Sequence, residues 1–266
     1  MKTVKKYYRV LKELIRLRFQ NLMLFRISVI GPFFVDGSLF AVQLMAFSAI
    51  YGNVEKIGGW GRGEMILYIG SFSLLNAVSM LLCFFGLQTI PGRIRSGEMD
   101  LYLTKPISPL FRLSFEKINP GSVLLVVMSL FIIGHGVRLL ETPPAAANIA
   151  AWLFWLLLMQ ILHYETEVVV RSITFFALSN NRVDQLEGAA LEMCMQLPGN
   201  TFYGVYKIIF CVILPYGILA TLPVQSMIGQ LTLPMAAQGL AVTAGYTFLT
   251  IFIWKKGIRH YNSASS

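Results

Sequence analysis

Side chains able to carry out acid–base, nucleophilic or metal chemistry are sparse in this chain and form no known catalytic pattern. His135, His163 and His260 are far apart, and neither an HExxH nor a GxSxG pattern occurs. His163 is followed by Glu165 and Glu167, which are metal-ligand types, but helical residues two apart point in different directions. The sequence therefore predicts no catalytic residue, no metal site and no enzyme.

A phosphate-binding loop of the form GxxxxGK[ST] is also absent from the sequence. We therefore expect that this chain does not bind or hydrolyse ATP by the usual nucleotide-loop mechanism, and we predict no cofactor in it. If the protein is driven by ATP, the nucleotide and its magnesium ion must bind to a separate motor polypeptide.

The densest group of charged residues lies in a hydrophilic insert at 89–119, between two long apolar stretches. Its charges gather around Gly97, and Pro106 and Pro109 prevent a long continuous helix. A passive membrane anchor has no need of such an insert, whereas a membrane protein driven by a soluble motor needs a docking surface. The residues predicted to contact the motor are Arg93, Arg95, Gly97, Glu98, Asp100, Lys105 and Pro106.

Two further groups of charges fall in or near apolar sequence. Glu167 and Arg171 are four residues apart, so on a helix they can pair, and each alone at the bilayer centre would cost about 2.5–3.5 kcal/mol. The pair either lets the helix insert or lines a polar route or gate. Asp184, Glu187 and Glu192 line a pathway if 182–200 crosses the membrane, and form a solvated face if that segment is cytoplasmic.

The elements that carry these residues are predicted to be membrane helices. Of the 266 residues, 56% are hydrophobic and only 13% are charged, which excludes an ordinary soluble domain. The chain has room for about six helices of roughly 20 residues in one domain, 1–266. The sequence thus predicts an all-α integral membrane protein, with no removable signal peptide. Its cysteines, predicted to be buried free thiols, are Cys83, Cys194 and Cys211.

The first 20 residues are predicted to form an amphipathic helix on the membrane surface. Its basic stripe, formed by Lys5, Arg9, Lys12 and Arg16, lies opposite an aromatic and aliphatic face. Spans are expected near 27–51, 65–88, 121–140, from 149 onward, and at 235–254, followed by a cytoplasmic tail at 255–266.

The distribution of positive charge predicts the orientation. Eight Lys and Arg residues precede Ile27, five lie in the 89–119 insert and three in the tail, against two in 52–64 and one near Arg138. The positive-inside rule therefore places both termini and the insert in the cytoplasm. Because the basic residues lie at these margins, anionic lipid is the expected partner and nucleic acid is not, although the isoelectric point is near 9.6.

The segment at 202–228 allows two courses, because it is apolar but interrupted by Pro215 and Pro223. In one, 205–228 is a simple span and 182–200 is cytoplasmic. In the other, 182–200 crosses as a polar span covered by protein, and 202–228 dips into the outer leaflet and returns. Both courses leave the C-terminus in the cytoplasm.

Parts of the insert and tail resemble the permease subunits of bacterial ABC exporters of the second type, in particular a branch of uncharacterised transport-system permeases. The insert follows a pattern of Arg-x-Gly-Glu-apolar-Asp-x-x-Leu-x-basic-Pro-apolar-Ser, and the tail follows Trp-x-x-Gly with a nearby Tyr and a small-residue end. The matching residues are Arg95, Gly97, Glu98, Asp100, Leu103, Lys105, Pro106, Ser108, Trp254, Gly257, Tyr261 and Ala264.

The resemblance implies an export function in the bacterial cytoplasmic membrane. It implies that the insert holds the coupling helix, which sits in a cleft of an ATPase subunit. It also implies that a second, non-identical permease completes the pathway, and a homodimer is the alternative. It also favours the re-entrant course for 202–228. The alternative from another class is a motor-independent secondary transporter or channel, for which neither an inverted repeat nor a role for the insert is evident.

Overall fold

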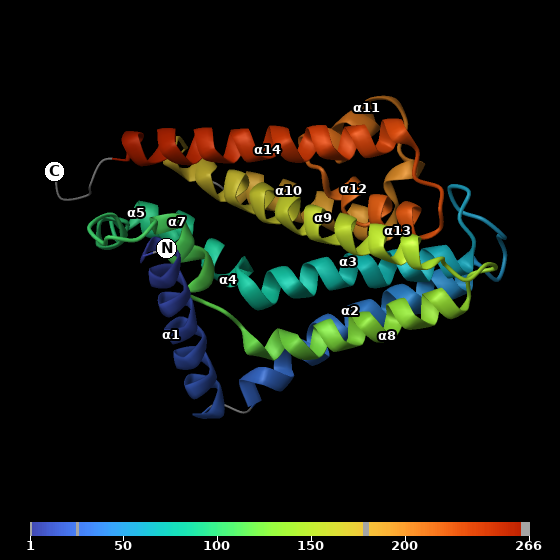
Figure 1. Ribbon diagram of the computed structural model, residues 1–266, viewed down its shortest axis with the longest axis horizontal. Helices are drawn as coiled ribbons and strands as arrows, with labels where there is room; N and C mark the ends of the chain where they lie inside the picture. The colour runs from blue at the N-terminus through green and yellow to red at the C-terminus, as the bar shows by residue number, and fades with distance from the viewer. Residues whose placement is uncertain (1, 25–26, 178–180, 262–266) are drawn as a thin grey trace.

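The computed structural model describes residues 2–24, 27–177 and 181–261, which form a bundle of helices with no β-sheet in these ranges (Figure 1). The predicted all-α membrane fold is confirmed. The long helices are α1 (Lys2–Leu24), α2 (Ile27–Ile50), α3 (Arg62–Leu82), α8 (Val123–Arg138), α9 (Ala146–Ser172), α10 (Asn181–Gln196) and α14 (Leu233–His260). The short helices are α4 (Phe84–Leu87), α5 (Ile90–Arg95), α6 (Asp100–Leu103), α7 (Pro109–Phe115), α11 (Gly204–Ile208), α12 (Tyr216–Leu219) and α13 (Thr221–Met227).

Within the described ranges, four helical stretches are long and apolar enough to cross a membrane, and a bent pair of helices makes a fifth candidate. The helix α2 has 24 residues, but its described apolar part is only Gly37–Ile50. The predicted second span, 65–88, is divided at Cys83, where α3 ends and α4 begins. The four stretches are Arg62–Leu82, Pro120–Arg138, Ala146–Phe175 and Leu233–His260.

The helices α3 and α8 pack most closely, because glycines allow their backbones to approach. A Cβ atom added at Gly136 would lie 2.6 Å from the Leu67 backbone nitrogen, and one at Gly70 would lie 2.8 Å from Ile133 Cγ1. Small residues at the contact are typical of membrane helix pairs, in which van der Waals packing replaces the hydrophobic effect. This packing fixes α3, from which the 89–119 insert emerges.

The segment at 204–227 is a bent pair of helices whose two arms meet at 76°. Its first arm ends in a π-helix, Ile209–Ile213, just before Pro215, and the Tyr246 hydroxyl on α14 donates to the Ile213 carbonyl. Near the start of the pair, Asn200 Nδ2 donates to the Gly58 carbonyl at 2.9 Å, and at its end Met227 lines a cavity with Thr142. The pair therefore begins and finishes at the end of the bundle that holds loops 51–61 and 139–145, which is the geometry of the re-entrant course.

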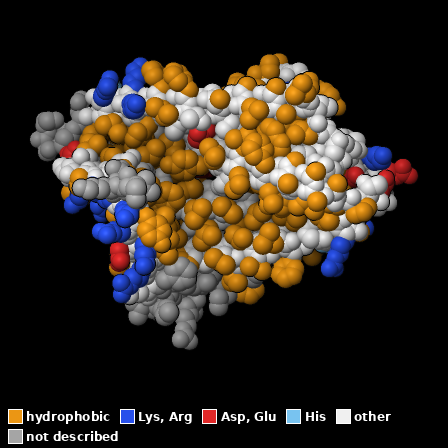
Figure 2. All heavy atoms as spheres, in the orientation of Figure 1, with side chains coloured by type: hydrophobic (Ala, Val, Ile, Leu, Met, Phe, Trp, Pro, Cys, Tyr) orange, Lys and Arg blue, Asp and Glu red, His pale blue; other side chains and the backbone are white. Residues whose placement is uncertain are grey.

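The helix α10 packs against α3, α9 and α12 with one face and leaves its other face exposed. The Tyr68 hydroxyl on α3 donates to the Cys194 carbonyl of α10, and Gln43 Nε2 on α2 donates to the Met195 carbonyl. The insert, α1 and the C-terminal end of α14 gather at the opposite end of the molecule from loops 51–61 and 139–145. A broad apolar surface covers the flank between these ends, and Lys and Arg side chains edge it (Figure 2).

Candidate functional site

The 89–119 insert folds as three short helices, α5, α6 and α7, after the single turn of α4. Gly97 forms the turn between α5 and α6 with φ of +77°, a conformation that glycine adopts without steric cost. Ser108 caps α7, because its Oγ accepts a hydrogen bond from the Phe111 amide at 3.5 Å. The charged insert is therefore an ordered structure rather than a loose loop.

A cluster around Glu116 holds these helices together, and the sequence did not single out this residue. Arg93 Nη2 lies 3.1 Å from Glu116 Oε1, and the Tyr102 hydroxyl donates to Glu116 Oε2 at 2.7 Å. Two guanidinium groups lie close to the Tyr102 ring, with Cζ of Arg93 at 4.6 Å and Cζ of Arg112 at 5.3 Å from its centroid. The predicted motor contact Arg93 is thus engaged within the insert.

The exposed face of the insert contains most of the other residues predicted to contact a motor. Arg95, Glu98, Lys105 and Pro106 are exposed. Leu101, on the short helix between them in the sequence, is 64% exposed, and the sequence analysis did not select it. An exposed apolar side chain in a segment with exposed charged residues is typical of a protein docking surface. We call Arg95, Glu98, Leu101, Leu103 and Lys105 the docking face.

The helix α1 braces the insert. Lys6 Nζ donates to the Pro106 carbonyl, the Tyr7 hydroxyl accepts from the Ser108 amide at 3.2 Å, and the Tyr7 ring meets Phe111 edge-on at 4.8 Å. Tyr7 belongs to the aromatic and aliphatic face that was predicted to contact lipid, and it packs on the insert instead. The basic stripe remains exposed, at Lys5, Arg9, Lys12 and Arg16.

The C-terminal end of α14 shares a buried apolar cluster with the insert, so the two stretches that carried the resemblance adjoin in space: Trp254 joins Met99 and Tyr102 in it. Phe175, which follows α9, completes the contact, because a Cβ atom at Gly257 would lie 2.4 Å from its Cδ2 and Trp254 meets it edge-on at 5.6 Å. Burial and the neighbouring Asp100 carboxylate raise the pKa of Tyr261. Asp100 therefore interacts within the chain, and Ala264 lies outside the described residues.

A second polar group lies inside the bundle, where one guanidinium faces three carboxylates. Arg171 Nη2 lies 3.2 Å from Glu167 Oε2 and 2.7 Å from Glu187 Oε2. Its Nη1 contacts Asp184, and the Tyr216 hydroxyl donates to Glu187 Oε1 at 2.8 Å. Arg171, Glu167 and Glu187 are each less than 5% exposed. The buried charge cluster therefore ties α9, α10 and the tip of the bent pair together.

A comparison with known protein families decides the identity of the chain. Residues 38–265 match the model of the ABC-2 family transporter proteins. The chain belongs to this family. No curated protein and no solved structure matches it. It is a permease of the type-2 ABC transporters, a multi-pass membrane component that associates with ABC ATPase subunits and is not itself catalytic.

Two other acidic residues of this ABC-2 permease, Glu165 and Glu192, lie outside the buried charge cluster. Glu192 is exposed and does not join Asp184 and Glu187 at Arg171. Glu165 accepts from Thr247 Oγ1 at 2.6 Å, and His163 Nε2 lies 3.9 Å from Glu167 Oε1. The described ranges contain no group of three or more His, Cys, Asp or Glu residues that could hold a metal ion.

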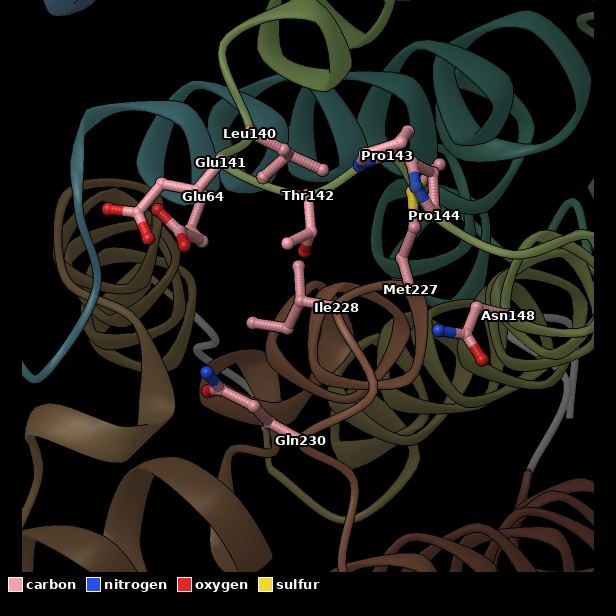
Figure 3. A pocket seen from close by; sticks show the side chains of 10 residues that line it. All are labelled: Glu64, Leu140, Glu141, Thr142, Pro143, Pro144, Asn148, Met227, Ile228 and Gln230. Atoms are coloured by element: carbon pink, nitrogen blue, oxygen red, sulfur yellow. The ribbon is translucent and has the colours of Figure 1, made fainter.

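A polar cavity of about 170 Å³ opens at the end of the permease opposite the insert. Figure 3 shows the Glu64 and Glu141 side chains on one side of it, with the Asn148 and Gln230 amides on other sides. Its walls come from α3, α9 and the loops that follow α8 and α13. The cavity therefore lies at the junction of the bent pair with the closely packed α3–α8 pair.

Proposed function

We propose that this permease is the transmembrane subunit of an ATP-driven exporter, coupled to separate ATPase subunits through the docking face of the 89–119 insert. ATP and magnesium bind to the ATPase subunits. A second permease completes the substrate pathway, and a non-identical one is favoured over a second copy of this chain. Both permeases lie in the bacterial cytoplasmic membrane, and the two termini of this chain lie in the cytoplasm. The observation that carries the proposal is that the insert has an exposed, charged face and is held by α1, by α3 with α4, and by α9 with α14.

The bracing gives the insert a rigid connection to the membrane helices. The insert continues directly from α3 and α4, packs in one apolar cluster with α9 and α14, and is bound by α1. A force applied by closure of the ATPases at Leu101 or Glu98 would therefore move these helices together as a rigid body. The permease supplies two conformations, and ATP hydrolysis in the partner supplies the energy to exchange them.

The charge-reversed variant Arg95→Glu/Glu98→Lys tests the coupling. Both side chains are exposed, so the fold should persist while charge complementarity to the ATPase is lost. We expect ATP-dependent transport by the reconstituted complex to fall at least about tenfold. Asp100 is left unchanged because it interacts within the chain.

The control for this test is Glu55→Lys in the loop at the opposite end, where Glu55 is also exposed. It should transport normally. Unchanged ATP-driven transport in the docking-face variant would contradict the proposal, and transport by the permease without any ATPase would favour the motor-independent alternative.

The orientation is tested with a single cysteine at position 203, in a chain whose three buried native cysteines are replaced. Tyr203 is 76% exposed, whereas the adjacent Gly204 has φ of +56°, at which a cysteine would be strained. Tyr203→Cys should react with a membrane-impermeant thiol reagent added to intact cells. The matched control, Thr104→Cys in the exposed insert, should react only after the cytoplasmic face is opened. The reverse result would contradict the proposed orientation.

A further inference from the structure

The helix α10 carries polar side chains on the face that points away from the bundle. Gln185, Glu192 and Gln196 are exposed, and at about 100° per residue they lie within about 40° of one another around the helix. Glu187 and Cys194 are buried, and the same helical geometry puts them on the opposite face. We call Gln185, Glu192 and Gln196 the polar stripe of α10.

The polar stripe lies at the depth of the membrane helices. Arg171 of α9 contacts Glu187 in the first half of α10, and the Tyr68 hydroxyl of α3 donates to the Cys194 carbonyl near its end. Both α9 and α3 belong to stretches that are long and apolar enough to cross a membrane. The 16 residues of α10 extend about 24 Å, which is most of the roughly 30 Å of a bilayer core. Lipid tails would therefore surround the stripe if neither protein nor water covered it.

Lipid is an unfavourable neighbour for the polar stripe. Charged side chains at membrane depth nearly always face protein or a water-filled cavity, because lipid tails cannot solvate them. Glu192 forms no ion pair with another described residue, so the chain itself does not neutralise this carboxylate.

Small residues beside the polar stripe suit a contact with another helix. A Cβ atom added at Gly188 would meet nothing within 4 Å, and Ala189 next to it is exposed. Small residues let the backbones of membrane helices approach closely, and polar side chains such as glutamine form hydrogen bonds across the contact. The stripe therefore has the composition of an interface between membrane helices.

The charge of the stripe indicates which protein covers it. Around a two-fold axis normal to the membrane, the α10 helices of two identical chains would run in parallel, so their Glu192 carboxylates would face each other. The low dielectric of the membrane interior strengthens the repulsion between two such charges. A cationic side chain opposite Glu192 would form an ion pair instead, with Gln185 and Gln196 able to form hydrogen bonds on either side of it.

We propose that the polar stripe of α10 is the surface on which a second permease docks, and that this partner is a non-identical chain with a lysine or arginine opposite Glu192. The inference rests on the proposed function, in which two permeases form the pathway, and it adds the surface and the charge that select the partner. Coupling to the ATPase takes place at the docking face of the insert and does not involve this surface.

The test measures association between two differently tagged copies of this chain, which are coexpressed in one membrane and recovered through one tag in a mild detergent. A wild-type copy should recover little of a second wild-type copy. It should recover at least about tenfold more of a Glu192→Lys copy, because this substitution supplies the cationic partner. Two Glu192→Gln copies should associate to an intermediate extent, because the repulsion is removed without forming an ion pair.

The matched control is Glu55→Lys, which makes the same change of charge in an exposed loop outside the stripe. A wild-type copy should recover it no better than it recovers wild type. Glu192 is exposed as well, so its substitutions leave packing intact, and size-exclusion chromatography of each copy checks this.

Two results of this test would overturn the proposal. Recovery of a second wild-type copy as strong as that of the Glu192→Lys copy would assign the stripe to a homodimer. Equal recovery of the Glu192→Lys and Glu55→Lys copies would show that the stripe is not a permease interface. Because association is measured without ATP or an ATPase, either result leaves the coupling proposal to its own test.

A water-filled pathway is the other possible neighbour of the stripe, and accessibility distinguishes it. In the complex purified from its native membrane through a tag on this chain, Gln185→Cys and Gln196→Cys should react slowly with a water-soluble thiol reagent. Rapid reaction at both positions would place the stripe on a water-filled wall and overturn the docking assignment.

Discussion

Replacing Arg171 with methionine is expected to prevent stable folding of the permease. The substitution removes the one guanidinium that faces Glu167, Asp184 and Glu187, of which Glu167 and Glu187 are almost completely buried. Removal of one partner of a buried ion pair costs about 3–5 kcal/mol, because the other charges stay buried without compensation. The loss is measured as the fraction of monodisperse protein after heating, by fluorescence-detected size-exclusion chromatography.

A combination that removes the buried charges together tests the same interpretation in the opposite direction. Arg171→Met/Glu167→Gln/Glu187→Gln removes both buried carboxylates with the guanidinium and leaves only Asp184, whose side chain is 41% exposed and stays hydrated. This variant keeps side-chain volume and should recover most of the thermal stability. Arg62→Met, at an exposed arginine that contacts only Ser48 among its described side-chain partners, serves as the matched control and should behave as wild type. If Arg171→Met alone were as stable as Arg62→Met, the cluster would not hold the bundle together.

Replacing Gly86 with alanine is expected to separate the coupling insert from the membrane helices. A Cβ atom at Gly86 would lie 2.1 Å from the Leu113 carbonyl oxygen and 2.6 Å from the Ser114 carbonyl oxygen, and both belong to the backbone of α7. Helix α7 must therefore move, at a cost of about 1–3 kcal/mol. We expect the chain to insert in the membrane but to lose most ATP-driven transport, measured with the reconstituted complex.

The matched control for this position is Gly92→Ala, six residues farther along in α5. A Cβ atom at Gly92 would meet nothing within 4 Å, so the variant should keep both stability and transport. Equal transport by the Gly86→Ala and Gly92→Ala variants would show that close packing of α4 on α7 is not needed for coupling.

The sequence alone determined those features that depend on composition or on neighbours within one helix. Apolar stretches of membrane-spanning length predicted the all-α fold, because the bilayer core requires about 20 consecutive apolar residues in a helix. The spacing of Glu167 and Arg171 predicted a contact, because residues four apart share one helix face, and the two side chains lie 3.2 Å apart. Charge density and prolines predicted a separate insert at 89–119, which forms short helices.

Only the tertiary structure decided which distant residues share these sites. Asp184, Glu187 and Tyr216 join Arg171 because α10 and the bent pair pack against α9, and no sequence period links such positions. The same holds for Glu116, which joins Arg93 and Tyr102 across two turns of the insert. The course of 204–227 was open in the sequence, since proline interrupts a simple span and a re-entrant pair alike. Tertiary contacts favour the re-entrant course: Tyr246 on α14 donates to the Ile213 carbonyl at the break, and Asn200, just before the first arm, donates to Gly58 in loop 51–61. The backbone at a proline break needs hydrogen-bond partners of this kind, which only neighbouring segments can supply.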